Sequence, residues 1–155
     1  MTKKGKFYEE WNIGDTFITP GRTVTETDIV LFAALTGDYH PIHTDEEYSK
    51  KHSIYETRIA HGLFTLSMSE GLFFRLGLLD GVAGAALGWN NVKFTKPVLP
   101  GDTLRVEIKV TDKRESKSRP DFGIVSLHYT TKNQRGEIVM EADRAVLVKK
   151  QDIKQ

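Results

Sequence analysis

The sequence predicts a single α+β domain in which an antiparallel sheet curves around one buried helix. Apolar residues have helical spacing in the first half of the chain and the two-residue alternation of half-buried strands in the second half. The helix expected over residues 62–76 is apolar around most of its circumference, which is typical of a buried helix. A sheet of about five strands wrapped around that helix has open edges, so pairing with a second copy is expected.

Length and composition exclude several classes of protein. The 155 residues suffice for one domain, expected to cover 1–155 with frayed, Lys-rich ends at 1–6 and 149–155. A net charge of +1 provides no basic field for nucleic acid. No apolar run approaches the roughly 20 residues of a membrane span. Because the chain has no cysteine and no signal-peptide pattern, we expect a cytoplasmic protein without disulfides or thiolate chemistry.

Capping residues predict the helices of the first half. Thr25 and Asp28 form the pattern of a capping box, and Gly37 suits the left-handed residue that follows a helix. A second, short helix is expected over residues 44–52, because acidic residues occupy its first turn and basic residues its last. Gly71 lies inside the third helix, where glycine costs about 1 kcal/mol relative to alanine. We therefore expect it to permit a close contact.

Alternation predicts the strands of the second half. The predicted strands cover residues 104–111, 125–130 and 138–148, with weaker candidates at 16–19 and 88–96. Arg144 breaks the apolar parity of the last strand. Residues 133–136, with the sequence Asn-Gln-Arg-Gly, indicate a hairpin turn between the last two strands. Together these segments predict a meander of antiparallel strands.

Asp38 and His43 are the residues best suited to chemistry. They lie five positions apart around Pro41, which fixes its own φ angle and biases the preceding residue toward an extended conformation. The turn is therefore stiff, and both side chains can point to one place. An aspartate and a histidine on either side of a water form a general base and its partner. The structural alternative is that Asp38 caps the next turn and His43 is an ordinary polar residue.

His61 and Gly62 form a second candidate because they begin the expected central helix. Unpaired amide groups at a helix N-terminus favour developing negative charge. Gly62 has no side chain to block an approaching carbonyl oxygen, so this position suits a polarised thioester carbonyl and its oxyanion. The structural alternative is that Gly62 only permits tight packing and that His61 is an ordinary residue at a helix start.

A metal site competes with both interpretations. Asp38, His40, His43 and His61 offer oxygen and nitrogen ligands. However, His40 and His43 span a proline turn rather than a helix, and no second cluster of ligands supports the site. We therefore expect no metal.

The motifs resemble those of the MaoC-like (R)-specific enoyl-CoA hydratases. Residues 36–43, Thr-Gly-Asp-Tyr-His-Pro-Ile-His, are similar to the family pattern Gly-Asp-x-Asn-Pro-(Leu/Ile)-His. The resemblance continues in family order at residues 7–15, 60–63 and 94–104, so it covers nearly the whole chain. One residue departs from the pattern, because His40 stands where the family has asparagine.

The resemblance implies a hotdog fold, normally paired as a homodimer, and a hydratase or dehydratase reaction. It implies that Asp38 acts as general base on a water that His43 also holds. The Gly62 amide would bind the thioester carbonyl, with His61 and His40 beside the substrate. The substrate would be an acyl thioester carried by coenzyme A or acyl carrier protein, and no cofactor is implied. If the family asparagine only braces the turn, His40 would do the same, and if that asparagine positions substrate, activity or substrate choice would differ.

Two other functions stay open at this point. The same fold hosts acyl-CoA thioesterases, because a fold does not determine a function. A non-catalytic acyl-thioester-binding subunit is the second alternative, and His40 is the feature that favours it. Bulky residues that are candidates for lining or closing an acyl tunnel are Phe64, Phe73, Phe74, Leu78 and Trp89. Lys93 and Lys96 are weak candidates for a phosphate contact.

Overall fold

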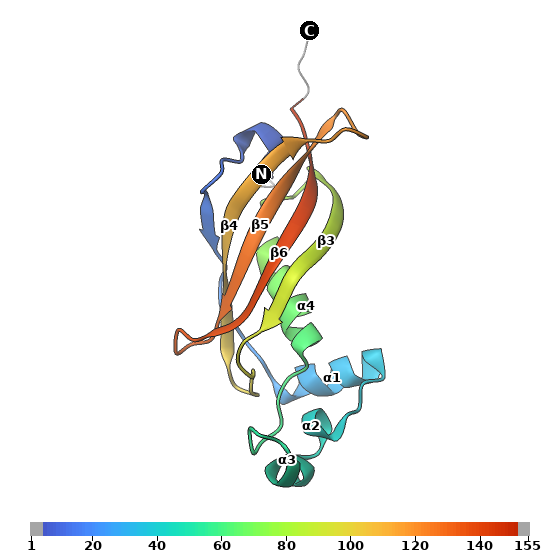
Figure 1. Ribbon diagram of the computed structural model, residues 1–155, viewed down its shortest axis with the longest axis vertical. Coiled ribbons are helices and arrows are strands. Elements are labelled where there is room, and N and C mark those ends of the chain that lie inside the picture. The colour runs from blue at the N-terminus through green and yellow to red at the C-terminus, as the bar shows by residue number, and fades with distance from the viewer. Residues whose placement is uncertain (1–4, 152–155) are drawn as a thin grey trace.

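The computed structural model describes residues 5–151 and shows an antiparallel sheet that curves around one helix (Figure 1). This confirms the α+β class predicted from the sequence. The helices are η1 (Tyr8–Glu10), α1 (Glu26–Thr36), α2 (Pro41–Thr44), α3 (Glu46–His52) and α4 (Gly62–Phe74). The strands are β1 (Thr16–Ile18), β2 (Arg22–Thr23), β3 (Ala83–Phe94), β4 (Thr103–Glu115), β5 (Phe122–Lys132) and β6 (Ile138–Lys149).

The sheet has the strand order β1-β4-β5-β6-β3, and β2 also pairs with β4. All of these pairings are antiparallel. Strand β3 therefore lies at an edge although it comes before β4 in the chain. Residues 133–137 connect β5 to β6, and the amide of Gly136 donates to the Asn133 carbonyl at 3.0 Å. The hairpin signal is thus confirmed.

The core lies between the sheet and α4. Alternate residues of β4, namely Leu104, Val106, Ile108 and Val110, are fully buried, and the residues between them face outward. From α4, Phe64, Met68 and Leu72 pack against them. The alternation predicted this inward face because successive side chains of a strand point to opposite faces of the sheet.

One face of α4 is exposed, although its sequence predicts burial all round. Leu63 is 62% exposed and Phe74 is 45% exposed, while the opposite face is buried. The sheet covers only one side of this helix, so apolar composition alone overestimates its burial within a single chain. The expectation for Gly71 was also wrong, because nothing lies within 4 Å of the position of an added Cβ atom. Helix α1 stays far enough away to leave a cavity there.

Two elements differ from the predicted ones. Residues 41–52 form two short helices rather than one beginning at Thr44, because Pro41 occupies the first turn of α2 and the Asp45 side chain caps α3. Strand β3 begins at Ala83, five residues earlier than predicted. It carries three register shifts against β6, and Asn91 has a φ of 51°. These irregularities interrupt the two-residue alternation by which strands are recognised.

Parts of both expected tails are hydrogen-bonded. The amides of Gly5 and Lys6 donate to the carbonyls of Asp80 and Leu78 at 2.9 and 2.8 Å. Lys149 belongs to β6. The rest of the two expected tails, 1–4 and 152–155, lies outside the described residues. Within residues 5–151, no helix combines the length and the apolar composition that crossing a membrane requires.

Helices α1, α2 and α3 form a separate group at one end of the sheet (Figure 1). Thr25 and Asp28 make the predicted capping box of α1, and Gly37 ends that helix with a φ of 77°. Arg58 ties the group together, because its guanidinium contacts the carboxylates of Glu26 and Glu46. The turn that contains Asp38 lies beside the start of α4, because the His61 ring contacts the Asp38 carbonyl and the Ile59 carbonyl contacts His43.

Candidate functional site

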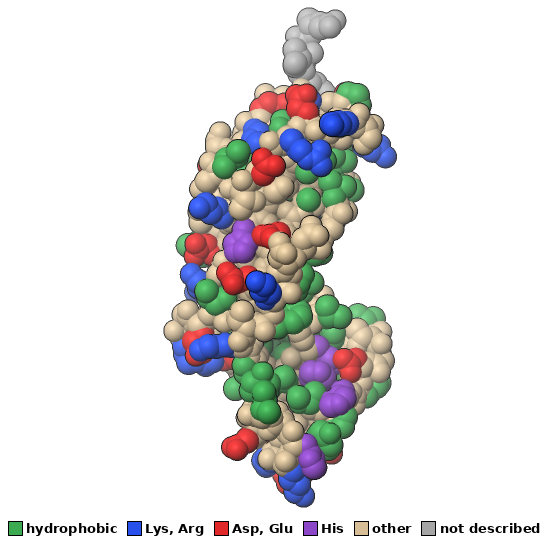
Figure 2. All heavy atoms as spheres, in the orientation of Figure 1, with side chains coloured by type: hydrophobic (Ala, Val, Ile, Leu, Met, Phe, Trp, Pro, Cys, Tyr) green, Lys and Arg blue, Asp and Glu red, His purple; other side chains and the backbone are tan. Residues whose placement is uncertain are grey.

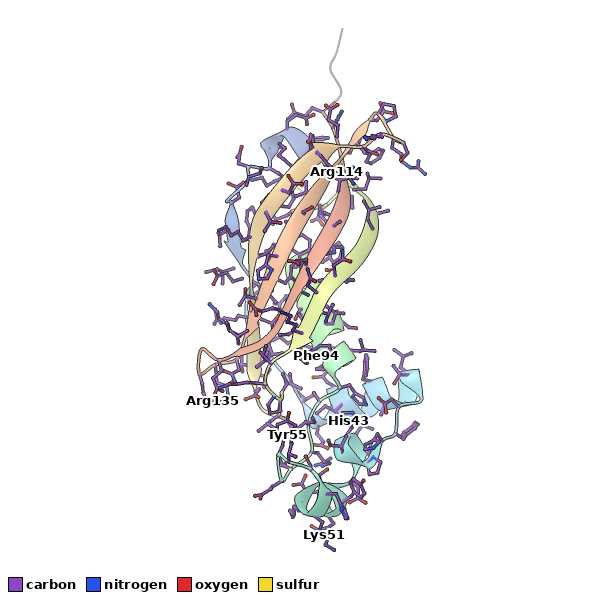
Figure 3. The ribbon with its side chains drawn as sticks, in the orientation of Figure 1. His43, Lys51, Tyr55, Phe94, Arg114 and Arg135 are labelled. Carbon is purple, nitrogen blue, oxygen red and sulfur yellow. The ribbon has the colours of Figure 1, made fainter. Side chains whose placement is uncertain are left out.

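The site lies where the N-terminus of α4 meets the turn between α1 and α2. One carboxylate oxygen of Asp38 and one ring nitrogen each of His43 and His61 lie within 4.8 Å of one another. Figure 2 shows that histidine side chains gather at this end of the molecule, among hydrophobic side chains. Figure 3 labels His43, which belongs to α2 and lies near α1. The structure thus brings together three of the residues that the sequence singled out.

Asp38 lies directly after Gly37, the left-handed residue that ends α1. Its Oδ1 accepts a hydrogen bond from the His40 amide at 3.2 Å, so the carboxylate also holds the turn. Its Oδ2 has no hydrogen-bond partner among residues 5–151. The side chain is exposed. One carboxylate oxygen is therefore available to a water molecule.

His43 is half-buried on α2, and its tautomer follows from its partner. Its Nδ1 lies 2.7 Å from the carbonyl oxygen of Ile59, which can only accept a hydrogen bond. Nδ1 therefore carries the proton, and Nε2 presents a lone pair. Burial lowers the pKa of His43, and the nearby His61 and His40 rings add to this effect. The hydrogen bond to Ile59 and the charge of Asp38 oppose it.

His61 is buried and contacts both of these residues. Its Nε2 lies 3.0 Å from the backbone carbonyl oxygen of Asp38. Its ring stacks on that of His43 with centroids 3.8 Å apart and planes inclined by 27°. The Phe32 ring packs against it at 5.0 Å. Its Nδ1 has no hydrogen-bond partner among the described residues.

Gly62 is the first residue of α4, and His61 is the N-cap without a side-chain hydrogen bond to the helix. The amides of this first turn therefore have no side-chain acceptor in the described part of the chain. The space next to Gly62 is not open, because a Cβ atom there would lie 2.7 Å from the Phe94 ring. A side chain at this position would therefore displace the Phe94 ring, which agrees with the alternative that Gly62 permits tight packing.

His40 braces the turn. It is the N-cap of α2, and its Nδ1 accepts a hydrogen bond from the Ile42 amide at 3.2 Å. A side-chain acceptor is what this position needs, and both asparagine and histidine supply one. His40 therefore braces the turn, which is one of the two roles expected for the histidine at this position.

Asp38, His43 and His61 also offer one carboxylate oxygen and two ring nitrogens to a metal ion, and these atoms lie within 4.8 Å of one another. His40 is not part of this cluster, because its Nδ1 accepts a hydrogen bond from the Ile42 amide. The expectation that no metal binds here stays a prediction.

Two cavities adjoin the site. The larger, about 480 Å³, lies between α1 and α4 and is lined by Arg22, Phe32, Leu35, Phe64, Ser67, Met68, Gly71, Leu72 and Arg75. Phe32 contacts His61, so one wall of this cavity is also a wall of the site. The smaller, about 150 Å³, adjoins Gly62 and has Lys96 at its edge, where the ammonium pairs with Glu137 at 2.7 Å. Lys93 lies exposed on β3.

The candidates for tunnel walls are dispersed. Phe64 lines the larger cavity, Phe73 is buried in the core, and Phe74 is partly exposed. Leu78 and Trp89 pack against the edge of the core. Of these five candidates, only Phe64 lines the larger cavity, which borders the site at Phe32.

An ion pair in the core was not predicted. Arg144 of β6 is 2% exposed and pairs with Glu70 of α4, which also accepts a hydrogen bond from the Tyr129 hydroxyl at 3.2 Å. The rings of Phe73, Phe74 and Trp89 surround the guanidinium. The break in apolar parity at Arg144 was the one sequence signal. It marked an unusual residue but did not indicate its partner.

A family model described as "MaoC like domain" matches residues 9–133. The chain is 41% identical over 111 residues to Protein MaoC of Klebsiella aerogenes, covering 72% of this chain but only 32% of that protein. It is 32% identical over 127 residues to an (R)-specific enoyl-CoA hydratase of Rhodospirillum rubrum, covering 82% of this chain and 81% of the relative.

Solved structures agree with this match. The MaoC-like dehydratase of Rhodospirillum rubrum superposes with a TM-score of 0.85 at 34% identity, covering 96% of this chain and all of that one. A Mycobacterium tuberculosis protein described as having a double hotdog fold gives a TM-score of 0.83 at 19% identity, covering 97% of this chain and 46% of that one. This second likeness shows the fold, which is the hotdog fold.

Proposed function

The chain belongs to the MaoC-like domain family, and from that membership we propose that it is an (R)-specific enoyl-CoA hydratase. Such an enzyme adds water to a trans-2-enoyl thioester and forms an (R)-3-hydroxyacyl thioester, and in reverse it is a dehydratase. Coenzyme A or acyl carrier protein would carry the acyl group as part of the substrate. No further cofactor is required, and a cytoplasmic location suits such substrates.

The observation that supports this proposal is the approach of Asp38 to His43 beside the first turn of α4. A carboxylate oxygen of Asp38 and a ring nitrogen of His43 lie within 4.8 Å of each other. This separation suits one water that hydrogen-bonds to both, because each such bond is about 2.8 Å long. The free Oδ2 of Asp38 and the lone pair on His43 Nε2 are both acceptors. Together they can hold both hydrogens of one water and leave an oxygen lone pair for attack.

The reaction would proceed without net proton release. Asp38 takes one proton from the water as its oxygen bonds to C3 of the substrate, and the C2–C3 double bond opens. The electron pair moves toward the thioester carbonyl, and the uncapped Gly62 amide stabilises the negative charge that develops there. The proton that Asp38 took then passes through His43 Nε2 to C2, so that one whole water has been added. His43 and Asp38 return to their starting states.

The acyl chain would occupy the cavity between α1 and α4. Its volume of about 480 Å³ lies in the range of small-molecule sites, and Phe32, Phe64 and Met68 give it apolar walls. Replacing Met68 by tryptophan would fill this cavity. We expect lower turnover of eight-carbon enoyl-CoA and little change with the four-carbon substrate. Equal losses on both substrates would place the acyl chain elsewhere.

We propose a homodimer formed through β3 and α4. Strand β3 ends the strand order of the sheet, so its outer edge has no strand partner within residues 5–151. Leu87 on β3 is 49% exposed, and Leu63 and Phe74 add apolar surface on α4. Sedimentation should give twice the mass of one chain, and Leu87→Lys with Phe74→Lys should give a single chain. A monomeric native protein would exclude this assembly.

The decisive experiment follows the loss of enoyl absorbance with crotonyl-CoA and longer enoyl-CoA substrates. We expect turnover by the native protein, an (R)-3-hydroxyacyl product, and almost none with the Asp38→Asn, His43→Ala double variant. Asp45→Asn is a matched control in the same segment, because asparagine also caps helices well. Normal turnover by the double variant would exclude the assignment.

The same assay separates the two alternative functions. A thioesterase would release free coenzyme A, and a thiol reagent detects it without background because the chain has no cysteine. A non-catalytic subunit would bind acyl-CoA tightly without changing it. Either result would replace the hydratase proposal.

A further inference from the structure

We infer that His61 is a positioning residue that holds the Asp38 turn and the His43 ring in register with the start of α4. This inference rests on the proposed function, but the contacts that carry it do not. His61 precedes Gly62, reaches the Asp38 backbone and stacks on His43. One buried ring thus connects the three groups to which the reaction assigns separate tasks. The residue needs no direct contact with the substrate.

The hydrogen bond to Asp38 fixes the tautomer of His61. A carbonyl oxygen has no hydrogen to donate, so His61 Nε2 must carry the proton in this 3.0 Å contact. Nδ1 then presents a lone pair, and no donor reaches it among residues 5–151. The hydrogen bond therefore orients the His61 ring toward the Asp38 carbonyl.

The stack on His43 constrains the second group. Ile59 fixes the His43 ring at Nδ1, and the His61 ring covers one of its faces at 3.8 Å. The ring of His43 can therefore neither flip nor tilt easily, and Nε2 keeps one direction. The titratable groups that face His43 are Asp38, His40 and His61. Of these, His61 is the buried one, and it disfavours a positive charge on its neighbour.

Phe32 of α1 also packs against His61. Its ring packs on His61 at 5.0 Å and on Phe64 at 5.7 Å. The imidazole is therefore held between α1, α2 and α4. Small displacements of a reacting group lower turnover strongly, and for this reason a rigid support is expected behind the Asp38 and His43 pair.

Two substitutions separate the contacts of His61. His61→Phe keeps a ring against His43 but removes the N–H donor to Asp38. His61→Gln keeps a donor of similar reach but removes the stacked ring. We expect kcat to fall about 100-fold in His61→Phe and less in His61→Gln, with KM changed less than threefold in both. The acid limb of the pH profile should move to higher pH in both variants, because the neighbour that disfavours charge on His43 is gone.

One control variant and two contrary outcomes belong to this experiment. His52→Gln removes an exposed histidine outside the site and should leave all values unchanged. A native kcat and pH profile in folded His61→Phe would overturn the inference. A rise in KM with an unchanged kcat would overturn it as well, since that result marks a substrate-binding residue.

The tautomers of His61 and His43 can be measured on the native protein. This test therefore needs neither enzyme activity nor a variant that folds. Nitrogen-15 NMR of the native protein should show His61 protonated at Nε2 and His43 protonated at Nδ1. The opposite tautomer at His61 would overturn the inference even in an active enzyme. The expected tautomers in a protein without hydratase activity would support the positioning role while excluding the proposed function.

Discussion

The sheet with α4 and the group of α1, α2 and α3 are built in different ways. In the sheet, buried aliphatic side chains such as Val106, Ile108 and Leu127 carry the packing, and regular alternation places them. In the helical group, most side chains are exposed, the helices are short, and polar contacts such as those of Arg58 hold the elements together. Of the candidate site residues, Asp38, His40 and His43 lie in the helical group, and His61 and Gly62 lie at the start of α4.

This difference implies that activity and stability respond to different substitutions. A buried apolar contact stabilises in proportion to its area, while an exposed ion pair contributes up to about 1 kcal/mol. Site residues in the helical group can therefore change with little effect on folding. Substitutions in the sheet change folding first. The helix α4 belongs to both regions, because its side chains fill the core while its first turn meets Asp38 and His43.

The largest expected effect is on activity. Asp38→Asn should lower kcat about 1,000-fold, because the amide cannot take a proton from the water. The amide oxygen still accepts the His40 N–H bond, so the unfolding free energy should change by less than about 0.5 kcal/mol. Steady-state kinetics and urea unfolding check the two values. A loss of stability that accompanies the loss of activity would contradict the separation of the two regions.

The second-largest expected effect is on the unfolding free energy, through the ion pair in the core. Arg144→Met should lower the unfolding free energy by about 3 kcal/mol, because it leaves Glu70 partly buried without its cation. Adding Glu70→Leu should recover most of that loss, since an apolar pair replaces the ion pair among Phe73, Phe74 and Trp89. A double-mutant cycle in urea measures both values. Additive losses would indicate that the two charges do not depend on each other.

The third effect is the pH dependence of turnover. His43 must be neutral to accept a hydrogen from water, and burial lowers its pKa below the ordinary value of 6.5. Because protonation occurs as the pH falls, activity should be constant around pH 7 and decline only below about pH 6.5. A pH profile of kcat/KM checks this. A decline with its midpoint above pH 6.5 would show that folding raises the pKa of His43, which would contradict this prediction.

The smallest effect is on the attachment of the helical group. Arg58→Ala removes the contacts to Glu26 and Glu46 and should lower the unfolding free energy by about 1 kcal/mol. Hydrogen exchange should quicken in α2 and α3 while the amides of β4 and β5 keep their protection. Equal acceleration in both regions would mean that they unfold as one unit.

Sequence reasoning succeeded where a local pattern determines a local structure. Thr25 and Asp28 identified the start of α1, Gly37 identified its end, and alternation identified β4 to β6. It placed the start of β3 five residues late, where register shifts between Ala83 and Gly88 break the alternation, and it missed that the Asp45 side chain separates two helices. Both errors lie where the backbone departs from a regular pattern without a change in composition.

The candidate site was only partly predictable. Asp38 and His43 lie five positions apart, so spacing alone indicated that they can meet. The contact of His61 with the Asp38 carbonyl spans 23 positions, and no spacing rule covers it. Glu70 and Arg144 lie even further apart in the chain, and only folding brings them together. Local sequence therefore indicates which residues are chemically useful, while tertiary packing decides which of them touch.

The Phe94 ring fills the volume that a side chain at position 62 would need. A methyl group there would have to push an aromatic ring out of its place on the edge strand that we propose as the subunit contact. A smaller residue at position 94 would therefore make room for a side chain at position 62. In the dimer that we propose, a change at the first residue of α4 would thus reach the surface between two copies of the chain.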